Sequence, residues 1–376
     1  MNKRDDSVFV WPLCTRLIHW MIALSFLLSL YTAFFHHLFR WHLAFGWMFC
    51  IGLVYRLIWG FFGPNYATFR TFKLSIKELK NYFVEKMQNR WRKIYAGHNA
   101  ASSWFTLIVL SLGQLIVLSG VLLQGTQEAG GLLAFLNPTY FQHSFWLFYA
   151  HTAIAYLLAL WAIIHISGVL IEQFYHKTNM VFAMVTGYKK AQGCDAKVSI
   201  RHHLFAYTVI VFAMISWYKI VYQDDTFLTH VYFSPLHYEQ EDHAYAQNCS
   251  KCHKNYPPFM LPKASWEKLM DGLDNHFGEA ITDKNITRSD QSDIREYLIT
   301  HSAETSSRKL AFRTLASLGE MRPISMTKVP YWREIHAHID RSVFKNDHVK
   351  NASNCFACHA GFEYGILDNT RIHIPQ

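Results

Sequence analysis

Two histidines lie fourteen residues apart inside a long uncharged stretch of the chain. His151 and His165 enclose an apolar run, and no charged residue occurs from Phe145 to Ile171. A run of this length and polarity is typical of a membrane-spanning helix. On such a helix the two rings lie within about 40° of each other and about 21 Å apart along the axis. Imidazoles at these depths are either satisfied by neighbouring helices or ligate iron, here one axial position on each of two stacked haems.

Haem ligation at both depths requires two further histidines on other helices. The first apolar segment of the chain contains His19, and the second contains His42. If the first segment enters the membrane from the cytoplasm, His19 lies at the depth of His165 and His42 at the depth of His151. The turn between the two segments supplies two alternative ligands near the second depth, His36 and His37.

Two arginines are positioned to reach haem propionates. Arg16 stands one helical turn before His19, and Arg56 follows His42 by fourteen residues. Arg56 therefore shares a face with His42 but lies about 21 Å away from it, beside the other haem. Guanidinium groups bind carboxylates well, so we expect both to pair with propionates. The alternative is that both side chains extend to the membrane surface.

Two Cys-x-x-Cys-His motifs occur in the last third of the chain, at Cys249–His253 and Cys355–His359. This motif attaches haem c, because two thiols add to the vinyl groups and the adjacent histidine ligates the iron. Cys249, Cys252, Cys355 and Cys358 are the predicted attachment residues. A structural zinc site would use paired Cys-x-x-Cys knuckles without two such histidines.

The sixth ligand of each haem c is less constrained by the sequence. His276 follows a helical pattern that begins near Trp266, and His336 lies in another that runs from Tyr331 to Phe344. A methionine ligand in place of histidine would raise the redox potential. The alternatives are the following residues: His301, His338, His348, Met260, Met270, Met321 and Met326.

The distribution of apolar and basic residues predicts the topology. The chain has 376 residues, 51% hydrophobic, and long uncharged runs fill the first 225 of them. We expect an all-α membrane domain at 1–200 and a fifth helix with a linker at 201–230. A small, mainly helical soluble domain follows at 231–376. The four haem-bundle helices are expected at the following ranges: 17–35, 41–62, 100–124 and 145–173.

The net charge of +9 comes mostly from lysines and arginines that cluster between apolar runs. The positive-inside bias explains this clustering better than nucleic-acid binding does, and it puts the N-terminus in the cytoplasm. Five crossings then place the last domain in the periplasm of a bacterial cell, with the helices in the inner membrane. Covalent haem is assembled in that compartment, so the topology and the motifs agree.

The N-terminal half resembles the bacterial cytochrome b561 family, whose relatives include the cytochrome b subunits of nickel–iron hydrogenases. The resemblance covers about Val10 to Lys190. It rests on these residues: Arg16-Leu-Ile-His19-Trp20, His42 through Arg56-Leu-Ile-Trp59-Gly60, Gly97-His98-Asn99, His151, His165 and Met184-Val-Thr-Gly187-Tyr-Lys189. It implies two non-covalent b haems with bis-histidine ligation and electron exchange with the membrane quinone pool.

The C-terminal part is similar to a dihaem cytochrome c family with bis-histidine irons. The likeness runs from about Tyr245 and favours His276 and His336 as sixth ligands, with His338 the main competitor for the second haem. Its matching residues are Cys249–His253, Tyr256-Pro257-Pro258, Trp266, His276-Phe277-Gly278, Pro323-Ile-Ser325, Tyr331-Trp332, His336 and Cys355–His359.

Together these features predict a membrane-bound tetrahaem protein with two haem b and two haem c. Electrons would pass from quinol through the b haems and c haems to a soluble periplasmic acceptor such as a small cytochrome c. Two alternatives are reverse flow, from a periplasmic donor such as superoxide to quinone, and a haem-based sensor of diatomic ligands. A sensor needs an open iron site, and the supply of histidines argues against one. The sequence indicates no oligomeric state and no quinone site.

Overall fold

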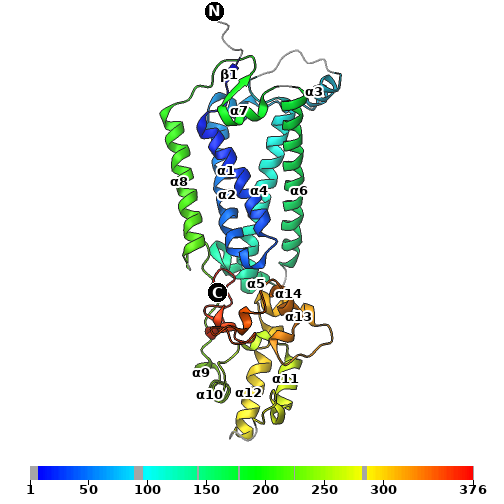
Figure 1. Ribbon diagram of the computed structural model, residues 1–376, viewed down its shortest axis with the longest axis vertical. Coiled ribbons are helices and arrows are strands. Elements are labelled where there is room, and N and C mark those ends of the chain that lie inside the picture. The colour runs from blue at the N-terminus through cyan, green and yellow to red at the C-terminus, as the bar shows by residue number, and fades with distance from the viewer. Residues whose placement is uncertain are drawn as a thin grey trace, which may run out of the picture. The chain divides into compact units, whose positions relative to one another are not determined.

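The computed structural model describes residues 7–88, 96–141, 144–176, 178–223, 225–281 and 286–375. The chain divides into two compact units (Figure 1). Unit 1 comprises Met1–Gly120 and Leu147–Gln223. Unit 2 comprises Val121–Trp146 and Asp224–Gln376. The segment between the third and fourth apolar helices thus groups with the C-terminal part, whereas the fifth helix groups with the membrane bundle. The predicted boundaries at 200 and 230 differ from this division.

Unit 1 is built on long apolar helices. In the described part of the chain, five helices are long and apolar enough to cross a membrane, which confirms the predicted all-α bundle. A π-helical turn, Ile171–Tyr175, continues the fourth of them. The five helices are α1 Leu13–Thr32, α2 Phe39–Phe62, α4 Ala100–Glu128, α6 Phe145–Leu170 and α8 Ile200–Tyr222.

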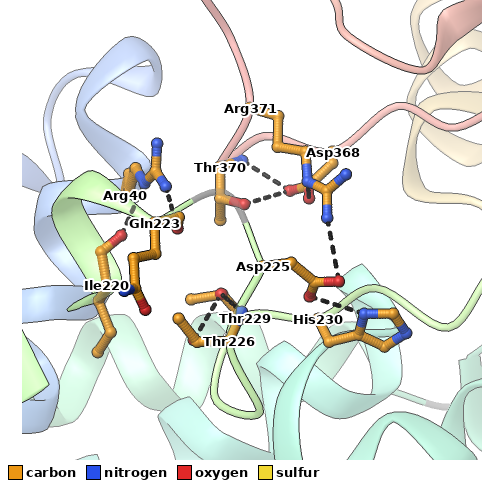
Figure 2. A network of polar contacts seen from close by, with 10 residues as sticks. All are labelled: Arg40, Ile220, Gln223, Asp225, Thr226, Thr229, His230, Asp368, Thr370 and Arg371. Atoms are coloured by element: carbon orange, nitrogen blue, oxygen red, sulfur yellow. Dashed lines mark hydrogen bonds and ion pairs between the residues drawn. The ribbon is translucent and has the colours of Figure 1, made fainter.

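The ends of these helices follow local chemistry. Pro12 precedes α1, which therefore begins four residues before the expected start. Gly63 and Pro64 end α2 at Phe62 as predicted, because proline excludes the preceding residue from helical geometry. At the end of α8, Arg40 donates to the carbonyls of Ile220 (2.7 Å) and Gln223, and so ties α2 to α8 (Figure 2).

The packing of unit 1 is that of a membrane protein. Large apolar side chains lie on the outer faces, among them Leu24, Leu118 and Ile163, each more than half exposed. Small polar residues such as Ser25 and Ser103 are buried between the helices. Without a hydrophobic drive between helices in lipid, close packing of small residues and interior hydrogen bonds hold a bundle together. The protein is therefore a multi-pass membrane protein.

An apolar cluster fills the middle of the bundle. It joins α1, α2, α4 and α6 through Phe26, Phe49, Leu53, Leu110 and Leu158. The cluster lies between the two levels at which the paired histidines occur, so it separates them with tightly packed hydrocarbon.

Several short elements gather at one end of the bundle, which we call the α3 end (Figure 1). They are β1 Ser7–Phe9, α3 Ile76–Met87, α7 Met180–Thr186 and β2 Tyr188–Lys190. The two strands pair antiparallel, with Val8 opposite Lys189. Ser75 caps α3 by accepting from the backbone N–H of Glu78. Part of the basic segment that precedes α4 (residues 89–95) falls outside the described residues.

Unit 2 contains short helices around one apolar core. That core includes Phe259, Trp266, Leu298, Val329 and Phe362. The helices are α5 Asn137–Tyr140, α9 Tyr238–Glu241, α10 His243–Cys249, α11 Lys263–Asp271, α12 Arg288–Thr300, α13 Lys309–Leu318 and α14 Pro330–Ile335.

Two helices of unit 2 are shorter than the sequence pattern indicated. α11 ends at Asp271 beside Gly272, and a 3₁₀ turn, Leu273–Asn275, leads to His276. α14 ends at Ile335, so His336 is its C-cap rather than an interior residue.

Polar contacts join residues 121–146 to the C-terminal part within unit 2. Glu128 pairs with the Lys309 ammonium and accepts from the Asn369 amide at 3.0 Å. The rings of Phe145 and Phe312 stack with centroids 3.6 Å apart. Near the C-terminus, Arg371 bridges two aspartates: Asp225 at 3.6 Å and Asp368 at 3.2 Å (Figure 2).

We expect Glu128→Gln to destabilise unit 2, because it leaves the Lys309 ammonium without its carboxylate. The two side chains are 27% and 15% exposed, so the expected loss is about 2 kcal/mol, below the value for a fully buried pair. Glu128 also holds the pKa of Lys309 above its usual value, although burial opposes this. The contribution is therefore complete below the unfolded pKa near pH 10.4 and is lost as pH rises through the folded value.

Thermal unfolding of the full-length protein in detergent measures this effect, with Glu320→Gln, an exposed carboxylate, as the matched control. Equal melting temperatures for the Glu128→Gln and Glu320→Gln variants would contradict the role assigned to the pair.

Candidate functional site

Four pairs of histidine rings face one another at nearly the same separation. In unit 1 the ring centroids of His19 and His165 are 6.4 Å apart, and those of His42 and His151 are 6.3 Å apart. In unit 2 the separations are 6.4 Å for His253 with His276 and 6.2 Å for His336 with His359. These are the eight histidines that the sequence indicated, in the predicted pairs.

This separation has a chemical meaning. A metal–nitrogen bond of about 2 Å on each side, with about 1.1 Å from nitrogen to ring centre, puts two axial imidazoles about 6 Å apart. Direct stacking or a hydrogen bond between two rings does not require this distance. The four pairs are therefore spaced for one iron each, although the ligand assignments themselves remain predictions.

Hydrogen bonds orient the second pair in unit 1. His42 Nδ1 donates to the carbonyl of Ser29 at 2.9 Å, and His151 Nδ1 lies 2.9 Å from the hydroxyl of Ser119. Engaging Nδ1 in this way leaves Nε2 of each ring as the nitrogen available to a metal. A side chain at Gly120 would approach His151 Cε1 to 3.2 Å, so this glycine makes room for the ring.

The pair at the α3 end is surrounded by polar atoms that lack protein partners. Among the described residues, Arg16 Nε, His19 Nδ1 and Arg56 Nη1 are buried without a hydrogen bond. Buried guanidinium groups are costly unless an anion satisfies them. Haem propionates beside the His19–His165 pair would supply that anion. The residues present therefore fit the cofactor.

The helix backbones also leave room for a macrocycle. α2 packs closely against α1 and α8, whereas α6 is not among the close neighbours of α1 or α2 in the described part of the chain. Yet α6 carries one histidine of each membrane pair. A Cβ at Gly46, one turn after His42, would meet only Ser29 Oγ, at 3.8 Å, so the backbone there is open to a flat ligand.

The first covalent motif lies at the end of α10. Cys249 is the last residue of that helix, and His253 Nδ1 donates to the carbonyl of Lys254 at 2.8 Å. His276 is presented by a tight turn in which Phe277 and Gly278 both have positive φ. Burial, followed by neighbouring His253, lowers the pKa of His276. Its ring is therefore neutral near pH 7, the form that ligates metals.

The second motif is organised similarly. His336 Nδ1 donates to the carbonyl of Trp332 at 2.8 Å, and the Trp332 ring stacks on the imidazole. Burial, followed by the neighbouring His336, lowers the pKa of His359 to about 4, so this ring is also neutral. None of the four motif thiols is in a disulfide, so all four are available for thioether bonds.

The alternative sixth ligands of the c haems differ in their surroundings from His276 and His336. Met260, Met270 and Met326 are buried in the core of unit 2, and Met321 is exposed. His301 Nδ1 contacts the carbonyl of Tyr297 at 3.0 Å. The sequence did not indicate the contacts that Ser29, Ser119, Gly120 and Trp332 make with these histidines. A serine inside an apolar helix was the one signal available for the first two residues, and it is a weak one.

We expect Ser119→Ala to weaken haem binding at the His42–His151 pair by about 10- to 100-fold, because the ring of His151 loses its orienting contact. Haem content by pyridine haemochrome and the midpoint potentials of the b haems report the loss. Ser111→Ala is the control, since Ser111 is exposed on the same helix. Identical haem retention in the two variants would exclude the orienting role.

We expect His336→Ala to open the iron of the second haem c, whereas His338→Ala leaves it closed. Carbon monoxide added to the reduced protein should then bind in the first variant only. Binding in the His338→Ala variant instead would transfer the ligand assignment to His338.

Comparison with known proteins finds two families in two separate parts of the chain. Residues 10–187 match the model of the prokaryotic cytochrome b561 family, and residues 245–366 match that of the dihaem cytochrome c family. A probable Ni/Fe-hydrogenase B-type cytochrome subunit from Rhodobacter capsulatus is 24% identical over 220 residues, which cover 50% of this chain and 83% of the relative.

Solved structures of dihaem cytochromes c are similar to about a third of this chain. The dihaem cytochrome c from Rhodobacter sphaeroides is 32% identical, with a TM-score of 0.29, over 33% of this chain and 95% of that one. A dihaem cytochrome c from Shewanella baltica is 26% identical, with a TM-score of 0.29, over 36% of this chain and 94% of that one.

The chain is thus a membrane haem electron-transfer protein in which residues 10–187 match the prokaryotic cytochrome b561 family and residues 245–366 match the dihaem cytochrome c family.

Proposed function

We propose that this protein carries electrons between the membrane quinol pool and a soluble periplasmic acceptor through two b haems and two c haems. The observation that carries the proposal is the set of four imidazole pairs with centroids 6.2–6.4 Å apart. Each pair fits one iron with both axial positions filled, which suits outer-sphere electron transfer.

Different residues of the chain have different roles in binding these cofactors. Haem bound at each pair supplies one-electron redox chemistry. His19, His42, His151 and His165 would ligate the two b haems, while Arg16 and Arg56 would pair with their propionates. His276 and His336 complete the ligation of irons already held by His253 and His359. Cys249, Cys252, Cys355 and Cys358 form the thioether bonds.

Charge supports an orientation with the α3 end in the cytoplasm. The segment around α3 carries exposed basic residues. They are Arg70, Lys73, Lys77 and Lys80. The positive-inside bias assigns such a segment to the cytoplasmic face of an inner membrane. Unit 2 then belongs to the periplasm, where a small soluble cytochrome c is the proposed acceptor.

The order of the segments along the chain supports a path for electrons from the membrane bundle to the c haems. α6 leaves unit 2 at Trp146 and presents His151 five residues later in unit 1. The His42–His151 pair therefore lies at the end of the bundle from which the chain continues into unit 2, and it is the proposed exit toward the c haems. Two-sided ligation of all four irons leaves no open position, which disfavours diatomic-ligand sensing.

We expect His165→Ala to lose the b haem at the α3 end and to slow quinol-driven reduction of the c haems. Reduction is followed after mixing a short-chain quinol with the protein in proteoliposomes, and pyridine haemochrome counts the b haems. His203→Ala, a histidine on α8, serves as the control. Two intact b haems in the His165→Ala protein would contradict the ligand assignment.

A redox titration of all the haems tests the direction of flow. Higher potentials in the c haems than in the b haems support transfer from quinol to the soluble acceptor. The opposite order would reverse the proposed direction and favour a periplasmic donor, such as superoxide, that reduces quinone.

A further inference from the structure

A glutamate follows the haem-ligand face of α6 into the α3 end of the bundle. Glu172 lies seven residues beyond His165, about two helical turns further along the axis. It belongs to the π-helical turn Ile171–Tyr175. Such turns are rare and concentrate at functional positions. An ionisable residue at the end of a spanning helix, on its interior face, calls for a functional explanation.

The carboxylate of Glu172 is largely covered by α3. The Lys86 ammonium lies 2.6 Å from it, and the Tyr82 hydroxyl donates to it at 3.1 Å. The side chains of Lys86 and Glu172 are 17% and 14% exposed, so the carboxylate is separated from bulk water by a thin layer of protein. Burial, followed by Glu172, raises the pKa of Tyr82, which keeps its hydroxyl a donor.

Further titratable groups face this carboxylate from neighbouring elements. Lys189 on β2 is 4% exposed. Burial lowers its pKa to about 8, with Glu172 opposing and Lys86 adding to the shift. His176 follows the π turn and is influenced by Lys86 and Glu172. The cluster around Glu172 thus comprises Tyr82, Lys86, His176 and Lys189, all within unit 1.

The cluster continues inward toward the haem-binding residues. Burial, followed by Arg56 and then Lys189, lowers the pKa of His98 to about 3. His98 Nδ1 is buried without a hydrogen bond among the described residues. Charged and polar groups therefore occur both at the Glu172 carboxylate and further inward, at His98 and Arg56. Proton transfer needs groups of this kind, whereas electron transfer between haems does not.

We propose that Glu172 is the proton acceptor that couples quinol oxidation at the α3 end to release of protons into the water beside α3. This inference rests on the proposed function. Oxidation of one quinol to quinone delivers two electrons, one at a time, to ferric haem, and it frees two protons. The Glu172 carboxylate takes up each proton in turn and releases it past Tyr82 and Lys86. In the reverse direction the same group returns protons to reduced quinone.

Quinol-driven reduction of the b haems in proteoliposomes tests the proposal, measured from about pH 6 to pH 9. Glu172→Gln should slow this reduction by about 100-fold and flatten its rise with pH, because the amide cannot accept a proton. Glu172→Asp should restore part of the rate. Glu85→Gln is the matched control, since Glu85 is exposed on α3 beside Lys86. Haem content and the rate of dithionite reduction should be the same in all variants.

A structural role for the Glu172–Lys86 pair predicts a different pattern. Lys86→Met would then slow the reaction as much as Glu172→Gln does, with the pH profile of both unchanged, and this result would overturn the proposal. So would equal rates for Glu172→Gln and Glu85→Gln. If the Glu172→Gln protein loses haem, the Tyr82→Phe variant serves as the test. A shift in the pH dependence of its quinol-driven reduction rate supports proton release past Tyr82, and an unchanged pH dependence rejects the proposal. Failure of the wild-type protein to accept electrons from quinol would instead reject the proposed function.

Discussion

The spacing of two axial imidazoles constrains how this bundle can pack. Helices in ordinary contact bring their axes within about 8–10 Å, which leaves no room for a macrocycle between them. α1, α2 and α8 pack in this close manner, whereas α6 stays further from α1 and α2 and reaches them through paired histidines. Hydrocarbon side chains fill the middle level, around Leu53, Leu110 and Leu158. The bundle is therefore closely packed between the two histidine levels.

The two membrane pairs have different polar surroundings. At one level both rings are oriented by interior partners, the Ser29 carbonyl and the Ser119 hydroxyl. At the α3 end, Arg16 Nε and Arg56 Nη1 are buried without a hydrogen bond among the described residues, and the cluster around Glu172 follows outward. Such groups are costly in a membrane bundle unless a cofactor or a reaction uses them. The asymmetry suits a protein in which one level exchanges protons as well as electrons, and the other passes electrons only.

In the C-terminal domain, turns and short helices rather than long helices hold the histidine rings at the same separation. There the motif histidines are held by the chain beside the thiols, and the opposing histidines come from a tight turn and from a helix C-cap. Residues 121–146, which connect two membrane helices, pack with this domain through Glu128, Asn137 and Phe145. Short helices and turns suffice there to place the rings of each pair 6.4 and 6.2 Å apart.

Local sequence determined much of this protein. Uncharged runs of about 20 residues can bury their backbone in lipid only as helices, so the spans of the bundle followed from composition. Each Cys-x-x-Cys-His motif lies within five consecutive residues, and the two histidines of α6 lie within one helix. Both features could therefore be identified from the sequence. Tertiary structure decided the rest. Ser119 beside His151, Trp332 beneath His336, the early end of α14 and the meeting of Glu172 with Tyr82 and Lys86 join residues whose partners the sequence does not specify. Their pairing depends on how separate helices pack, and no local pattern records that.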